Sequence, residues 1–216
     1  DLEFTPVFPE VEETPAPVIE RYLPSRDYEK HNRELKRARR FLKQRSQKTW
    51  FEIRLSAVID PFLEEARQLC EEWKEIEMAA SDSGDKAPLC FCHGDYQYHN
   101  ILRQDRGFFL VNFEKCQADG PVRDLYLLLR KLLEKSEWDA EWGRVLLAAY
   151  ESVRPLKPYE RQDLFYRLSY PEKLWKIVNF YYNSGKAWIP EKNQEKLDRL
   201  LEQETARKKF LKLLQR

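Results

Sequence analysis

The residues of this sequence best suited to chemistry lie in one short stretch. Asp95 and Asn100 stand five residues apart on a predicted loop, and Asn112 follows on the next predicted strand. Phosphoryl transfer needs a hydroxyl nucleophile held in line and neutralisation of negative charge, commonly by magnesium. Asp95 would accept or orient the proton of the hydroxyl, and Asn100 would offer a neutral side-chain oxygen to magnesium. The spacing therefore indicates a phosphoryl-transfer loop.

Residues around this loop are expected to position it. His93 would shape the loop by hydrogen bonding, which makes Asp95 and His93 the candidate catalytic residues, and Gly94 would supply backbone freedom. Asp124 would either brace the loop through backbone N–H groups or act as a first-turn acid favoured by the helix dipole. His-Gly-Asp alone is a weak signal, and a turn with an Asx cap is the alternative interpretation. The preceding apolar strand, the following hairpin and the later Asp-Leu pair make the whole pattern much more specific.

The elements that must carry the loop are mainly helical. Residues 89–92 predict a short buried strand, and residues 101–103 and 108–111 flank a glycine-containing turn, which predicts a β-hairpin. Gly120 and Pro121 are expected to open a helix with a leucine-rich face. Apolar spacing and proline starts predict further helices over residues 26–48, 51–80, 139–152, 158–169, 171–184 and 190–214.

Two consecutive N-terminal segments, residues 1–25 and 26–48, differ sharply in charge. Residues 1–25 hold five prolines and six acidic residues without periodicity, which predicts an extended acidic arm. Residues 26–48 hold ten basic and three acidic residues with apolar positions at helical spacing. This basic amphipathic helix either presents a solvated face or docks to an acidic partner. Nucleic acid is a third interpretation and a weaker one, because few aromatics interleave the basic residues.

Composition limits the function classes. The 216 residues carry a net charge of +1, so there is no global case for nucleic acid or an anionic membrane. Hydrophobic residues at 42% allow a packed core, while 35% charged residues and only six glycines favour a helix-rich fold. No apolar run approaches the roughly 20 residues of a membrane span. The chain begins with Asp1, which is consistent with a processed or excised product.

The cysteines are expected to be reduced thiols. Cys90 and Cys92 alternate along the predicted strand and would point to the same face. With His93 and His99 nearby they raise zinc binding as an alternative, but a second ligand pair at suitable spacing is lacking. The cysteine pattern therefore favours a reducing compartment.

Three groups outside the loop also carry expectations. His31 stands among charged residues and is expected to be an exposed helix residue. The cluster 207–209 is expected to place cations in the last turns of a helix, where the dipole favours them. The aromatic residues between 175 and 188 are expected to pack between helices, with a role at the border of an acceptor pocket as the alternative.

The loop and its flanks resemble a known group of proteins. Residues 92–95, 100–102 and 111–125 resemble the aminoglycoside phosphotransferase and choline kinase group of kinase-like folds. Within that group, residues 30–36 with the basic helix after them, and the aromatic insert 96–99, are similar to the CotS family of spore-coat proteins. The resemblance covers roughly residues 26–185. It implies an α+β, mainly helical fold in which residues 26–216 form the C-terminal lobe and a small hairpin carries the catalytic-loop motif.

The resemblance also implies cofactors and a metal site. ATP and Mg²⁺ would be used if the protein is active, with Asn100, Asn112 and Glu114 as the cofactor-binding and metal-binding residues. Relatives usually carry Asp at the position of Asn112, and an amide brings no negative charge to magnesium. Glu114 would partly compensate from the same strand face. Residues 1–92 also show neither a phosphate-covering glycine loop nor a strand lysine, so the smaller lobe is expected to be missing.

Two functions therefore remain open. The first is a spore-coat-associated kinase-like protein whose inherited ATP-dependent phosphoryl transfer to a small hydroxyl acceptor is weakened or lost. The alternative is a non-catalytic pseudokinase scaffold that binds other spore-coat proteins through the acidic arm and the basic helix. By resemblance, either would begin in the mother-cell cytoplasm and end in the spore coat.

Overall fold

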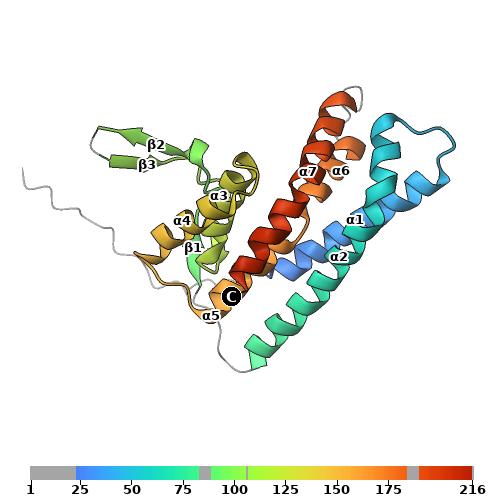
Figure 1. Ribbon diagram of the computed structural model, residues 1–216. Coiled ribbons are helices and arrows are strands. Elements are labelled where there is room, and N and C mark those ends of the chain that lie inside the picture. Colours follow the sequence, from blue (N-terminus) through green and yellow to red (C-terminus); the bar gives the residue numbers. More distant parts are fainter. Residues whose placement is uncertain (1–22, 83–88, 106, 184–189, 216) are drawn as a thin grey trace, which may run out of the picture.

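A computed structural model describes residues 23–82, 89–105, 107–183 and 190–215, and these are mainly helical, as predicted (Figure 1). The predicted acidic arm lies almost entirely outside the described residues. The helices are α1 (Pro24–Gln44), α2 (Trp50–Asp82), α3 (Val122–Lys135), α4 (Ala140–Glu151), α5 (Pro158–Ser169), α6 (Glu172–Asn183) and α7 (Pro190–Leu214). None of the helices in this described part has the length and apolar character needed to cross a membrane.

Two small antiparallel strand pairs carry the loop of interest. β1 (Cys90–Cys92) pairs with β4 (Gln117–Asp119), and β2 (Ile101–Gln104) pairs with β3 (Gly107–Leu110). The β2–β3 pair is the predicted hairpin, and it projects from the helical body (Figure 1). A short 3-10 helix, η1 (Tyr98–Asn100), links the loop after β1 to β2. The loop is therefore held at both ends by strands.

The prediction of a buried strand at 89–92 was only partly right. Cys92 is buried, but Phe91 is 74% exposed and Cys90 is also exposed. Only one neighbouring strand, β4, pairs with β1, and Phe91 points to the face opposite Cys92. The two thiols do share a face, with their sulfur atoms 3.7 Å apart, and all four cysteines are free. Among the described residues, no three His, Cys, Asp or Glu side chains converge on a potential metal position.

Helix α7 joins two hydrophobic cores. One core lies between α1, α2, α6 and α7, with the fully buried residues Leu35, Leu55, Leu174 and Leu197. The other lies between α3, α4, α5 and α7, and its buried members include Leu133, Leu164 and Phe210. Leucine repeats at helical spacing thus bury one stripe of each helix. This packing fixes α3, which carries the residues that brace the loop.

Helix α1 differs slightly from the basic helix expected over 26–48. It begins two residues earlier, with Pro24 in the first turn, and it ends at Gln44. Proline is favoured there because the first helical N–H has no partner within the helix. The four helices predicted from residue 139 onward match α4 to α7 to within one residue at each end.

His31 is buried, which contradicts the expectation of an exposed residue. Its ring stacks on Trp175 of α6, with centroids 3.5 Å apart and planes 18° apart. Burial lowers the pKa of His31 below its usual value of 6.5. Tyr181 also packs in the core and Trp175 packs against it, which fits the packing interpretation of this aromatic region. Trp188 lies outside the described residues.

Arg207 lies in the last turns of α7, as expected, and it is buried. Its guanidinium donates to the backbone carbonyl of Ser169 at 2.8 Å and forms ion pairs with Glu65 at 2.9 Å and Glu204 at 2.7 Å. The side chain is 8% exposed and connects α7, α5 and α2. It satisfies carbonyl oxygens at the end of α5 that the helix itself cannot satisfy.

Candidate functional site

The loop 93–97 is tied to the start of α3 by one carboxylate. The backbone N–H of His93 donates to Asp124 Oδ2 at 2.7 Å, and that of Gly94 donates to Asp124 Oδ1 at 3.0 Å. Both donors belong to buried residues, so the carboxylate satisfies amides that water cannot reach easily. The predicted bracing role of Asp124 is confirmed.

His93 holds the loop to the segment after β3. Its Nε2 lies 2.9 Å from the carbonyl oxygen of Val111, and its Nδ1 accepts from the backbone N–H of Asp95 at 3.2 Å. These partners fix a neutral ring with the proton on Nε2, because a carbonyl can only accept and an N–H can only donate. Both ring nitrogens are occupied by backbone groups, so His93 acts as a positioning residue.

Gly94 allows the loop to meet the segment 113–116 closely. Its φ is +75°, and a Cβ built there would lie 1.9 Å from the carbonyl oxygen of Lys115. Only glycine fits both the left-handed conformation and this approach. The contact brings Lys115 beside the loop, which no spacing in the sequence indicated.

Asp95 is engaged by two neighbours. Gln97 Nε2 donates to its Oδ1 at 2.8 Å, and Lys115 Nζ donates to its Oδ2 at 2.8 Å. The hydrogen bond from Lys115 is the main cause that lowers the pKa of Asp95 below its usual value. The carboxylate is therefore ionised and able to orient a hydroxyl, but it is a weak base and Lys115 occupies one of its oxygens.

Asn100 and Asn112 form a closed pair. Asn100 Nδ2 donates to the backbone carbonyl of Asp95 at 2.8 Å, which fixes the orientation of the amide and directs its Oδ1 toward Asn112. Asn112 Nδ2 then donates to Asn100 Oδ1 at 2.9 Å. Asn112 adopts a φ of +67°, a conformation that Asn and Asp tolerate better than most residues. The oxygen predicted to face magnesium thus already accepts a hydrogen bond from an amide donor.

Glu114 does not lie on a strand with Asn112. Residues 111–116 form a loop between β3 and β4, so the alternation that would put both side chains on one face does not apply. Glu114 is exposed, and within the described residues no contact joins it to Asn112 or Asn100. The prediction that Glu114 and Asn112 share a strand face was wrong. That Glu114 binds a metal in place of the missing carboxylate stays a prediction.

The residues around Asn100 do not fit magnesium as they stand. Magnesium is held mainly by carboxylate and phosphate oxygens, and here Asn112 offers an N–H where an oxygen would be needed. The nearest carboxylate of the loop, Asp95, is paired with Lys115. A metal at this position would require the Asn112 side chain to turn away and the Asp95–Lys115 pair to separate.

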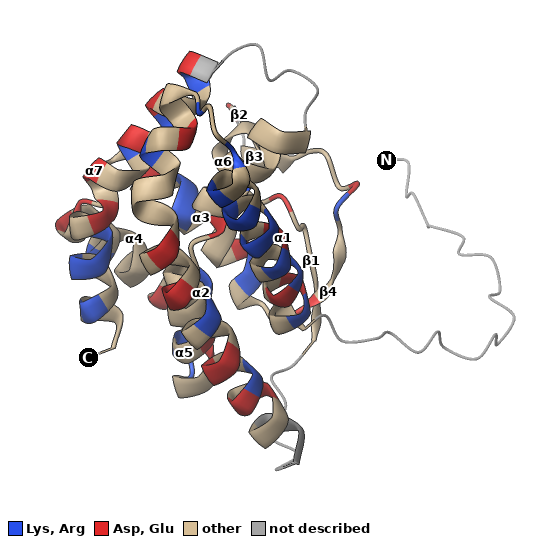
Figure 2. Ribbon diagram, turned by 90° about the vertical axis from the view of Figure 1, so that its right-hand side faces the viewer, with Lys and Arg blue, Asp and Glu red and all other residues tan. Residues whose placement is uncertain are grey.

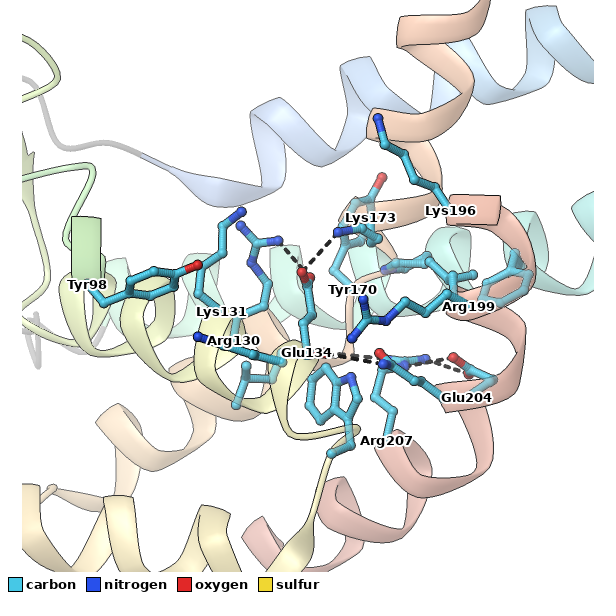
Figure 3. Close-up of a pocket in the computed structure, with 17 residues that line it drawn as sticks. Tyr98, Arg130, Lys131, Glu134, Tyr170, Lys173, Lys196, Arg199, Glu204 and Arg207 are labelled. Atoms are coloured by element: carbon cyan, nitrogen blue, oxygen red, sulfur yellow. Dashed lines mark hydrogen bonds and ion pairs between the residues drawn. The ribbon is translucent and has the colours of Figure 1, made fainter. Parts of the chain in front are cut away.

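A basic pocket opens beside the loop (Figure 3). Its volume is about 360 Å³, and it lies between α3, α6 and α7, with Tyr98 of the loop on its edge. Tyr98 also contacts Lys135, whose Nζ lies 5.0 Å from the centre of the phenol ring. No motif indicates this pocket, because its walls come from helices far apart along the chain.

Comparison with known proteins identifies the family. Residues 64–214, which include the loop and most of the helices, match the family described as spore coat putative kinase YutH. The chain belongs to the YutH family of spore coat putative kinases. This assignment to the YutH family confirms the resemblance to kinase-like spore-coat proteins that the sequence predicts.

Individual relatives agree with this assignment. Spore coat protein S of Bacillus subtilis (strain 168) is 31% identical over 159 residues, which are 69% of this YutH-family chain and 45% of that protein. An aminoglycoside phosphotransferase from Alicyclobacillus acidocaldarius has a similar structure, with a TM-score of 0.74 at 19% identity over 89% of this chain and 57% of that one. At this identity the second likeness shows the fold alone. The chain spans about half the length of both proteins.

Proposed function

We propose that this YutH-family chain is a coat-associated kinase-like lobe whose phosphoryl transfer from ATP to a hydroxyl acceptor is strongly weakened or lost. The observation that carries the proposal is the 2.9 Å hydrogen bond from Asn112 Nδ2 to Asn100 Oδ1. It supplies a donor at the position where a metal-binding kinase site needs an acceptor. The mother-cell cytoplasm and then the spore coat would be the compartments, and the names of the family and of spore coat protein S support the spore coat.

The expected loss of activity follows from charge. A carboxylate at position 112 would help to neutralise the triphosphate through its metal, and an amide contributes no charge. Losing a principal metal ligand costs several kcal/mol of transition-state stabilisation, and each ~1.4 kcal/mol is a factor of ten in rate. The Lys115–Asp95 pair adds a second barrier, because an acceptor hydroxyl competes with Lys115 for the carboxylate.

Some parts of the loop nevertheless support retained acceptor binding. Asp95 is braced on its N-terminal side by His93 and Asp124, and Gln97 leaves it partly accessible. Its side chain is 28% exposed, so a hydroxyl has a path to it. Asp95 would orient the hydroxyl, and His93 would hold the backbone of the loop during binding.

A scaffold without catalysis is the second candidate. Helix α1 presents a row of cations to solvent (Figure 2), and the exposed members are Arg26, Lys30, Arg33, Lys36, Arg37, Arg40 and Lys43. The hairpin also exposes several apolar side chains, namely Leu102, Phe108, Phe109 and Leu110. A basic helix and an apolar hairpin are both suited to binding other coat proteins, the first through acidic surfaces.

The test is magnesium-dependent ATP binding and turnover by the longest native product of this gene, with an Asn112→Asp variant beside the parent. The proposal expects little or no turnover by the parent and at least partial recovery by the variant. Parent turnover that equals the variant would contradict it. Absence of ATP binding and turnover in both proteins would favour the scaffold. The next measurement would then be the binding of purified coat proteins to the parent and to a variant that lacks the cations of α1.

A further inference from the structure

The basic pocket beside the loop has an unusual charge balance. Seven of its lining side chains are cationic and only two, Glu134 and Glu204, are anionic. The cations are Arg130, Lys131, Lys135, Lys173, Lys196, Arg199 and Arg207, and Figure 3 shows most of them around the same space. They come from α3, α6 and α7, so the fold gathers them from three helices.

Part of this positive charge is compensated. Glu134 forms ion pairs with Arg130 and Lys173, each at 3.0 Å, and Arg207 is held by Glu204 and by Glu65 from outside the pocket. Glu172 lies 3.9 Å from Arg130 Nε, an atom that is buried and has no hydrogen-bond partner among the described residues. Counting all four glutamates, the positive charges are still in excess.

Of the remaining cations, Lys135 and Lys196 lie over the rings of Tyr98 and Phe180, which leaves Lys131 and Arg199 for a ligand. In the described parts of the chain, no ion pair is formed by Lys131, Lys135, Lys196 or Arg199. Lys131 is half-buried in the wall, and burial together with the nearby Arg130 lowers its pKa. A half-buried ammonium beside several other cations is destabilised, and an anion would relieve that cost.

The pocket reaches the segment that follows Asp95 in the chain. Tyr98, three residues after Asp95, forms its edge and directs its hydroxyl toward the side of Lys131 (Figure 3). After Lys115, Lys131 is among the charges that lower the pKa of Asp95, so Lys131 and Asp95 are within electrostatic reach. A ligand anchored in the pocket could therefore present a hydroxyl to the loop.

We propose that the pocket binds a small anionic acceptor, a hydroxyl compound that carries a phosphate monoester. Lys131 and Arg199 bind the phosphate, Arg130 supports it from the wall, and a hydroxyl at the other end reaches toward Asp95. The volume of about 360 Å³ suits a small molecule of this kind. A polycationic ligand is repelled by the same walls. The description of this ligand as the acceptor rests on the proposed function; its binding does not.

The experiment measures binding without turnover. Glucose 6-phosphate, glucose and inorganic phosphate are titrated into the full chain by calorimetry, at two salt concentrations and without ATP or magnesium. A Lys131→Gln/Arg199→Gln double variant is compared with Arg40→Gln/Lys43→Gln, which removes the same charge from exposed positions on α1. The inference expects the sugar phosphate to bind, glucose not to bind, and the pocket variant to lose at least tenfold in affinity while the α1 variant stays within twofold.

The outcomes separate the inference from the proposed function. Equal losses in the two double variants, or equal binding of glucose and glucose 6-phosphate, would overturn the inference. Tighter binding of an acidic phosphopeptide than of any small phosphate would overturn its small-molecule part. Phosphate binding by a protein without kinase activity would leave the inference standing and count only against phosphoryl transfer.

Discussion

Removing the Asp124 carboxylate should loosen the loop 93–97 and destabilise the whole domain. The side chain accepts two hydrogen bonds, at 2.7 Å from the N–H of His93 and at 3.0 Å from the N–H of Gly94. Hydrogen bonds to a charged group contribute about 1.5–3 kcal/mol each. Asp124→Ala removes both and leaves two buried amides, so the free energy of unfolding should fall by about 3 kcal/mol or more. Asp124→Asn keeps one acceptor oxygen and should show an intermediate loss.

Urea unfolding and amide hydrogen exchange together test this prediction. The comparison variant is Asp139→Ala, which removes a single exposed hydrogen bond of 2.8 Å to the N–H of Trp142 at the start of α4. Loss of such a helix cap costs about 1 kcal/mol. In Asp124→Ala the amides of His93 and Gly94 should also exchange faster, while in Asp139→Ala they should not. A loss below about 1 kcal/mol with unchanged exchange at both amides would refute the bracing role.

Three further substitutions have defined outcomes. Gly94→Ala should displace the segment at Lys115 and destabilise the fold by more than the ~1 kcal/mol typical of a positive φ alone, measured by urea unfolding, because its Cβ would meet a backbone carbonyl. Lys115→Ala should raise the pKa of Asp95, which an NMR titration measures. It should lower the free energy of unfolding by less than about 1 kcal/mol, because the Lys115–Asp95 pair is exposed. The lowered pKa of His31 means that the unfolded chain takes up a proton first as the pH falls, so stability should decline below the usual His value of 6.5. His31→Phe, which can keep the stacking on Trp175, should show a weaker decline in unfolding experiments between pH 7 and 5.

The sequence was most informative where local signals decide the structure. Pro158 and the apolar spacing after it predicted α5 to the residue, because a proline in the first turn and a buried stripe both act within a few residues. The Asp124 brace was predictable for a similar reason. The motif places an acid at the start of a helix whose N-terminus faces the loop.

The sequence was least informative where distant segments meet. His31 is buried only because Trp175 of α6 reaches α1, and Arg207 is buried only because α5 ends beside α7. The ion pair between Lys115 and Asp95 depends on the close approach of the backbone at Gly94 to Lys115. The alternation of side chains along a strand does not predict this approach. From the sequence alone, such polar and charged residues are expected to face solvent. The groups that bind them come from distant segments, which only tertiary packing brings close.

A magnesium titration will show whether Asn112 closes the metal position by donating to Asn100. Parent, Asn112→Asp and Asn183→Asp, which makes the same charge change at an exposed position of α6, are titrated by calorimetry while the Asn100 side-chain amide is followed by NMR. Only Asn112→Asp is expected to gain affinity for Mg²⁺, by at least tenfold or ~1.4 kcal/mol, with a shift of the Asn100 signal. Equal affinity in the parent and Asn112→Asp, with the Asn100 signal shifting in both, would contradict it.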